Sequence, residues 1–181
     1  MNKFFQFNEF IELGKIFSDC EAYLIALEHF DKALLISDLT LNKEILAEAY
    51  HQRGRVKYHL GYEEAAIKDE DIAIQLNKKN PQYYFYRGIE YYILDKNQLA
   101  INDFDNAIKL NTHNPLFFYF RGLAKIAINL KSDAIKDFDS AEELDYKSSD
   151  LFLDRGNAKY ELGIYEEAIR DFYQAKQNRD N

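Results

Sequence analysis

The sequence predicts an all-α fold made of five stacked helix-turn-helix units. One observation is that the only two prolines, Pro81 and Pro115, lie 34 positions apart. A second is that a series of glycines has the same period, except that its first interval is 40 positions. A fixed period of about 20 to 50 residues is typical of stacked supersecondary units. The repeating glycines are Gly14, Gly54, Gly88, Gly122 and Gly156.

Small and aromatic residues recur around each of these glycines. An aromatic residue stands four positions before the glycine, and alanines stand 12 and 19 positions after it. Small residues let two helix backbones approach, and large ones fill the space beside them. Each unit is therefore expected to hold a helix A around the glycine and a helix B around the alanines. The alanines are Ala26, Ala33, Ala66, Ala73, Ala100, Ala107, Ala134, Ala141, Ala168 and Ala175.

The turn between the two helices also has a signature. Seven positions after the repeating glycine stand Gly61, Asp95, Asn129 and Gly163. These residue types readily adopt the left-handed conformation that ends a helix. The first unit has Glu21 there, which fits this conformation less well.

The chain ends and one insertion depart from the period. Asn42 is expected to cap a lengthened helix A, and the extra residues form either a longer connection or a lip on a groove. Phe4, Phe5 and Phe7 either pack on the first unit, fill a groove or mediate self-association. Lys176 and Asn178 replace apolar residues of other units, as a polar solenoid end requires. The predicted boundaries are 1–6 for a Phe-rich extension, 7–40 for repeat 1, 41–46 for the insertion, 47–80 for repeat 2, 81–114 for repeat 3, 115–148 for repeat 4, and 149–181 for repeat 5 with a polar C-terminal cap.

The combined pattern resembles the tetratricopeptide repeat family. The order aromatic, glycine, alanine, aromatic, alanine and proline, recurring every 34 positions, carries this resemblance together with Gly-Tyr-Glu-Glu-Ala at 61–65. It covers residues 7–181. It implies a right-handed α-solenoid whose concave face binds peptides or proteins, and it names no partner.

Four repeats carry arginine just before the glycine, where the family usually has leucine. An aspartate stands 16 positions after each arginine, whereas repeat 1 has Leu13 and His29 at the two places. We interpret the pairs as structural ion pairs between helices; the alternative is an arginine ladder that reads an acidic ligand. The pairs are Arg53 and Asp69, Arg87 and Asp103, Arg121 and Asp137, and Arg155 and Asp171.

The family resemblance also implies which helix A positions line the concave groove. We expect an apolar centre with a partly basic end and an acidic end, suited to an apolar or amphipathic peptide. The alternative is that these residues only pack repeats together. Phe85, Ile89, Tyr92, Tyr119, Leu123 and Ile126 are the expected anchors, His51 and Arg55 the orienting residues, and Tyr58, Asn157 and Tyr160 the remaining lining. Glu70, at a position where the other repeats have Phe, is a second candidate for a special role.

Composition excludes several functions. The 181 residues carry a net charge of −8 and no basic block, which disfavours nucleic-acid binding. The chain has one cysteine, no signal-like apolar stretch and no membrane-length apolar run, so we expect a cytoplasmic protein that does not enter membranes.

No motif for catalysis, metal or cofactor binding stands out, so we expect a non-catalytic scaffold or adaptor without a cofactor. The alternative is a small secretion-type or assembly chaperone that holds an unfolded client and forms a homodimer through the Phe-rich N-terminus.

Overall fold

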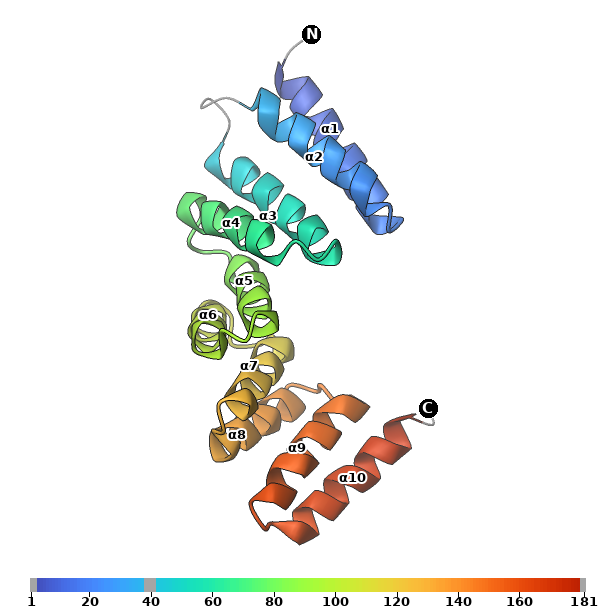
Figure 1. The fold of residues 1–181 in the computed structure, drawn as a ribbon, viewed down its shortest axis with the longest axis vertical. Coiled ribbons are helices and arrows are strands. Elements are labelled where there is room, and N and C mark those ends of the chain that lie inside the picture. The colour runs from blue at the N-terminus through green and yellow to red at the C-terminus, as the bar shows by residue number, and fades with distance from the viewer. Residues whose placement is uncertain (1–2, 38–41, 180–181) are drawn as a thin grey trace. The chain divides into compact units, whose positions relative to one another are not determined.

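The computed structural model describes residues 3–37 and 42–179, and these residues form ten α-helices and no strand (Figure 1). The all-α prediction is confirmed. The helices are α1 (Lys3–Asp19), α2 (Tyr23–Ile36), α3 (Lys43–His59), α4 (Glu63–Leu76), α5 (Pro81–Ile93), α6 (Asn97–Leu110), α7 (Pro115–Ala127), α8 (Lys131–Glu143), α9 (Ser149–Glu161) and α10 (Tyr165–Arg179).

The chain divides into two compact units. Unit 1 spans Met1–Leu94 and contains α1 to α5, and unit 2 spans Asp95–Asn181 and contains α6 to α10. Within unit 1, α1 packs on α2 and α3 packs on α4. Within unit 2, α7 packs on α8 and α9 packs on α10. Each of these pairs is a predicted helical hairpin.

The hairpin turns have the predicted left-handed backbone. The φ angles are 73° at Gly61, 56° at Asp95, 63° at Asn129 and 79° at Gly163. Glu21 also reaches 58°, although its side chain disfavours this conformation. The same pair of backbone hydrogen bonds closes this turn as closes the one at Gly61, so packing of the two helices outweighs the local preference.

The lengthened helix A of repeat 2 is also present. The Asn42 side chain accepts a hydrogen bond from the Glu44 amide at 2.8 Å, and α3 is 17 residues long where α5 has 13. Residues 43–46 of the predicted insertion therefore extend this helix. Residue 41 lies outside the described residues, as do 38–40.

The repeating glycines allow the two helices of a hairpin to touch. A Cβ atom on Gly122 would lie 2.6 Å from Phe138 Cε1, and one on Gly14 would lie 2.8 Å from the equivalent atom of Phe30. Both phenylalanines are fully buried. In repeat 2, Glu70 takes the place of the phenylalanine, and its Oε1 would lie 3.2 Å from a Cβ on Gly54.

The first and last described helices expose both polar and apolar side chains. Phe7 is buried in the core of unit 1, while Phe4 and Phe5 are exposed. Lys176 and Asn178 are exposed, as expected for a polar cap. However, the same helix, α10, also exposes Tyr165, Ile169 and Tyr173, so its outer face is mixed. Among the described helices, none combines the length and hydrophobicity that crossing a membrane requires.

Candidate functional site

In three repeats, the arginine before the repeating glycine lies between two B helices. In unit 1, Arg53 donates from Nε and Nη2 to Asp69 of α4, at 2.8 and 2.6 Å. Its Nη1 donates to Asp31 of α2 at 2.8 Å. A single arginine thus ties helix B of its own repeat to helix B of the preceding repeat.

Unit 2 repeats this arrangement twice. Arg121 binds Asp137 of α8 at 3.0 and 2.6 Å and Asp105 of α6 at 2.6 Å. Arg155 binds Asp171 of α10 at 3.0 and 2.7 Å and Asp139 of α8 at 2.7 Å. The second aspartate, which precedes the arginine by the same separation, was missed in the sequence although it recurs as regularly as the first.

A lysine one turn after the arginine joins each network. Lys57, Lys125 and Lys159 donate to the aspartate that their arginine binds, at 2.7, 2.8 and 3.0 Å. The arginines are therefore engaged by carboxylates of the protein itself, which favours the structural interpretation over a ladder that reads an acidic ligand. For Arg87, the described contact is with Asp71 of the preceding helix B, at 2.6 Å.

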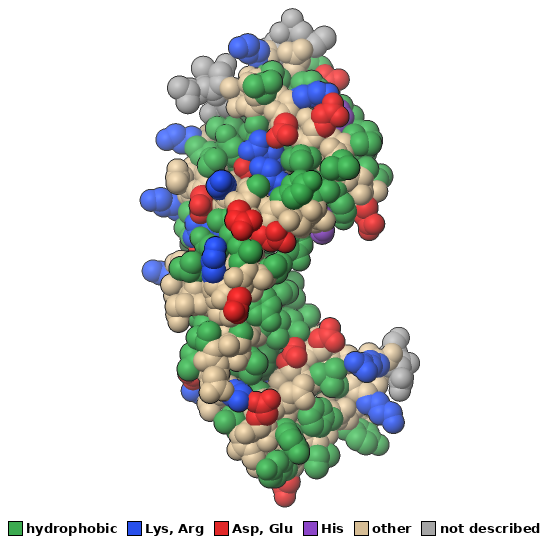
Figure 2. Space-filling model, viewed as in Figure 1, with side chains coloured by type: hydrophobic (Ala, Val, Ile, Leu, Met, Phe, Trp, Pro, Cys, Tyr) green, Lys and Arg blue, Asp and Glu red, His purple; other side chains and the backbone are tan. Residues whose placement is uncertain are grey.

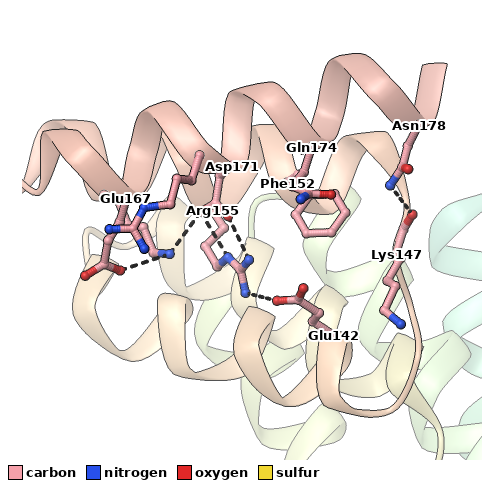
Figure 3. Close-up of a pocket in the computed structure, with 10 residues that line it drawn as sticks. Glu142, Lys147, Phe152, Arg155, Glu167, Asp171, Gln174 and Asn178 are labelled. Atoms are coloured by element: carbon pink, nitrogen blue, oxygen red, sulfur yellow. Dashed lines mark hydrogen bonds and ion pairs between the residues drawn. The ribbon is translucent and has the colours of Figure 1, made fainter. Parts of the chain in front are cut away.

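A polar surface cavity of about 490 Å³ opens beside the last of these networks. Figure 3 shows Arg155 between Asp171 and Glu142, with the latter at 2.6 Å from Nη1. Lys159 binds Glu167 at 3.2 Å, and Asn178 donates to the Lys147 carbonyl at 2.8 Å. The cavity is thus walled by both signs of charge, and the ion pairs of Arg155 and Lys159 join α9 to α8 and α10. Its lining is Glu142, Lys147, Phe152, Arg155, Lys159, Glu167, Arg170, Asp171, Gln174 and Asn178.

Three of the predicted groove residues in unit 1 are buried. His51 is 4% exposed, and its Nδ1 lies 2.8 Å from Glu70 Oε1. Phe85 and Ile89 are 5% and 8% exposed. These three side chains are buried, so their expected placement on an open groove is wrong.

The other predicted residues of unit 1 keep part of their surface. Arg55, Tyr58 and Tyr92 are half-buried. The Arg55 guanidinium lies 5.1 Å from the centre of the Tyr86 ring, in a cation–π geometry. His59, next to Tyr58 in the chain, is exposed and forms an edge contact with the Tyr58 ring at 5.2 Å. Unit 1 therefore presents a partly cationic, aromatic face on its A helices.

In unit 2, all of the predicted groove residues except Tyr119 keep accessible surface. Tyr119 is 8% exposed and packs in the core, which corrects its assignment as a groove anchor. Leu123 and Ile126 of α7 are half-buried, and Asn157 and Tyr160 of α9 are exposed. Unit 2 therefore presents a largely apolar face on its A helices.

A tyrosine–carboxylate bond joins neighbouring A helices in both units. The Tyr119 hydroxyl donates to Asp154 of α9 at 2.9 Å, and burial raises the pKa of Tyr119 and of Asp154. In unit 1, the Tyr83 hydroxyl donates to Glu48 of α3 at 3.2 Å, and burial raises the pKa of Tyr83 to about 12. These bonds hold consecutive A helices side by side.

Two buried glutamates of unit 1 have strongly raised pKa values. Burial raises the pKa of Glu70 to about 7, although the nearby His51 opposes this shift. Burial raises the pKa of Glu90 to about 8, with smaller contributions from Glu63 and Glu70. Glu90 was missed in the sequence, although its position holds Val56 in repeat 2 and small apolar residues in repeats 4 and 5.

Within the described residues, no group of three or more His, Cys, Asp or Glu side chains has the geometry to hold a metal ion.

No protein-family model matches the sequence. A TPR repeat-containing protein of Methanocaldococcus jannaschii, MJ1428, is 40% identical over 65 residues, which are 36% of this chain. The matched segment spans only 10% of that protein.

Solved structures match over nearly the whole chain. The crystal structure of MamA superposes with a TM-score of 0.82 at 20% identity, covering 93% of this chain and 95% of MamA. MamA 41-end from Desulfovibrio magneticus RS-1 has a TM-score of 0.85 at 14% identity and covers 97% and 96%. YrrB, described as a TPR protein with an unusual peptide-binding site, has a TM-score of 0.76 at 20% identity and covers 95% and 86%.

This chain has the tetratricopeptide repeat fold. The repeat period, the helical hairpins and the structural likeness all agree on this fold. The arginine networks depart from the pattern of the tetratricopeptide repeats that the sequence resembles, because arginine stands where that family usually has leucine.

Proposed function

We propose that this chain is a non-catalytic scaffold or adaptor that binds an apolar or amphipathic peptide segment on its A helices. The observation that carries the proposal is that the first and fourth positions after the repeating glycine keep accessible surface in unit 2. These positions hold Leu123 and Ile126 on α7, and Asn157 and Tyr160 on α9. Register equivalence places them on the same side of two helices that the Tyr119–Asp154 bond joins.

The two units support different peptide chemistry. The unit 2 face offers apolar side chains for apolar anchors of a ligand. The unit 1 face offers Arg55, Tyr58 and His59, which suit an acidic or aromatic group. An amphipathic segment can therefore bind to the face of unit 1 or to the face of unit 2 without contacting the other. YrrB, with its described peptide-binding site, is a structural precedent for this use of the fold.

The experiment selects ligands from a phage-displayed library of random dodecapeptides against the full chain. Enriched peptides are then measured by fluorescence anisotropy against the wild type and Ile126→Glu. A charge on the unit 2 face is expected to weaken binding at least about ten-fold, because it forces an apolar anchor against a carboxylate. Ile169→Glu is the matched control, since Ile169 is an exposed isoleucine of α10 away from this face.

Two results would overturn the proposal. One is the absence of any enriched peptide. The other is equal binding of every enriched peptide to the wild type and Ile126→Glu, with circular dichroism showing that the variant is folded. Tyr119→Glu is unsuitable for this test, because Tyr119 is a buried residue whose loss would unfold the hairpin.

The alternative is a homodimeric chaperone that associates through its Phe-rich N-terminus. Phe7 belongs to the core, so deletion of the segment would damage the fold. Replacing the exposed Phe4 and Phe5 by serine tests the same idea without this damage: the chaperone alternative expects a dimeric wild type that becomes monomeric. A cytoplasmic location accords with the sequence and remains part of the proposal.

A further inference from the structure

Each helix A docks on the preceding helix B through the same polar contact. The arginine just before the repeating glycine binds an aspartate of the preceding repeat, at the position immediately after the Phe or Glu70 position. This contact marks the register in which one repeat stacks on the next. The pairs are Arg53 with Asp31 at 2.8 Å, Arg87 with Asp71 at 2.6 Å, Arg121 with Asp105 at 2.6 Å, and Arg155 with Asp139 at 2.7 Å.

Apolar contacts accompany the arginine in the same register. Tyr83, five positions before its glycine, shares a buried cluster with Ile74, which directly follows the second repeating alanine of the preceding repeat. Val56, two positions after its glycine, shares a cluster with Leu27, which directly follows the first repeating alanine of the preceding repeat. Apolar positions therefore accompany the polar contact where α3 stacks on α2 and where α5 stacks on α4.

The outer faces of α1 and α10 hold the same stacking positions, but with different residue types. Leu13 replaces the arginine, and Tyr173 replaces the aspartate and is 66% exposed. Glu9 of α1 occupies the position of Tyr83, and Lys176 of α10 occupies the position of Ile74. Both side chains are exposed.

The positions of Val56 and Leu27 stay apolar on these outer faces. Ile16 of α1 is 55% exposed, and Ile169 of α10 is 64% exposed. Their equivalents are covered inside the units: Val56 is fully buried, and Ile67 is 9% exposed. Both isoleucines thus occupy stacking positions that no other described helix covers.

We propose that α1 of a second copy of this chain docks on α10, in the register in which helix A of one repeat stacks on helix B of the repeat before it. That register brings Leu13 to Tyr173, Ile16 to Ile169, and Glu9 to Lys176. Every pair is complementary, two of them apolar and one of opposite charge. In this contact the pair of opposite charges lies at the positions of Glu9 and Lys176, instead of at the positions of the arginine and the aspartate.

The composition of α10 supports an occupied rather than a solvated face. A solenoid end that stays in water needs a polar outer surface. Instead, α10 exposes Tyr165, Ile169 and Tyr173 at every fourth position, on one side of the helix. Figure 2 shows hydrophobic side chains reaching the surface over α9 and α10. A contiguous exposed apolar stripe of this kind marks an interaction site.

A contact between different faces of two copies is heterologous, so it extends into rings or open chains. It uses faces distinct from the A-helix surfaces proposed for peptide binding. Peptide binding and end-to-end association therefore stand or fall separately.

Charge reversal at the Glu9 and Lys176 positions tests the proposal. Sedimentation velocity of the full wild-type chain is expected to show a mean mass that rises with concentration. Glu9→Lys and Lys176→Glu, each by itself, place like charges in the contact and are expected to raise the dissociation constant at least about ten-fold. An equimolar mixture of the two variants restores opposite charges in contacts between unlike copies, and association is expected to return. Lys136→Glu, on an exposed site of α8, is the control and should behave as the wild type.

Three outcomes overturn the proposal. In the first, the wild type keeps its monomer mass at all concentrations, and the partner of the α10 face would then be a different protein. The wild type associates but both single variants associate equally well, which places the contact elsewhere. Association is lost in a Phe4→Ser and Phe5→Ser double variant while Glu9→Lys retains it, which assigns the contact to the Phe-rich segment. Circular dichroism verifies that each variant is folded.

Discussion

Replacing Asp137 by leucine should destabilise unit 2 more than replacing Asp137 and Arg121 together. Asp137 is 5% exposed in its side chain and is bound by Arg121 and Lys125, whose side chains are 18% and 17% exposed. The single substitution leaves both cations near the hairpin core without this carboxylate. Breaking a buried pair on one side costs about 3–5 kcal/mol of the free energy of unfolding.

The structure lowers this figure, because Arg121 also binds Asp105 and both cations reach some solvent. We expect a loss of about 2–3 kcal/mol for Asp137→Leu. Adding Arg121→Leu removes the stranded guanidinium and supplies apolar contacts, so the double variant should be at least about 1 kcal/mol more stable than the single one.

The assay is urea unfolding followed by circular dichroism, with the free energy obtained by linear extrapolation. Arg121→Leu completes the double-mutant cycle, and its cost should be smaller than that of Asp137→Leu because Asp137 keeps Lys125. Lys136→Leu breaks an exposed pair with Asp133 and is the control, expected to change stability by less than about 0.5 kcal/mol. Additivity of the two single changes within about 0.5 kcal/mol would refute energetic pairing of Arg121 and Asp137.

Two further predictions concern the helix contacts. Burial raises the pKa of Glu90 to about 8, so the folded chain holds a proton that the unfolded chain releases near its ordinary value of 4.5. This contribution to stability is complete below pH 4.5 and is lost as pH rises to about 8, with a slope of up to about 1.4 kcal/mol per pH unit. Glu90→Gln should flatten that decline in urea unfolding across this pH interval, and curves that stay parallel to the wild type would contradict this. Gly122→Ala should cost about 1–3 kcal/mol, because its methyl group would lie 2.6 Å from the Phe138 ring. The atom nearest to a methyl group on Gly54 is Glu70 Oε1, at 3.2 Å, so Gly54→Ala should cost less. Equal melting temperatures of these two glycine variants would show that the ring contact does not limit helix approach.

The repeat architecture could be predicted from the sequence because its signals are local. The left-handed turns depend on the residue seven positions after each glycine, and the start of α3 depends on a single asparagine side chain. Such preferences act within one turn of chain. The first arginine partner was also accessible, because Arg53 and Asp69 recur and disappear together in the sequence.

Which aromatic and apolar residues stay accessible was decided by tertiary packing. Tyr83, Phe85 and Tyr86 stand almost in a row on α5, and successive residues of a helix point about 100° apart, so they face different sides. Periodicity shows that some of them are buried, but only the neighbouring helices determine which. In the folded chain Tyr83 and Phe85 became core, while Tyr86 received the Arg55 guanidinium.

The buried acids and the outer faces needed the same information. The burial of Glu90 depends on the helices that surround it, because burial raises its pKa more than any single neighbouring charge does. The exposure of Ile169 likewise depends on the lack of a covering helix among the described residues, since the equivalent Ile67 is buried. The sequence by itself determined the repeats, the helix ends and the arginine–aspartate pairs of repeats 2, 4 and 5, because these follow from preferences repeated in register. The tertiary structure alone decided which surfaces remain for a partner, because solvent exposure is a property of the packed neighbours of a residue.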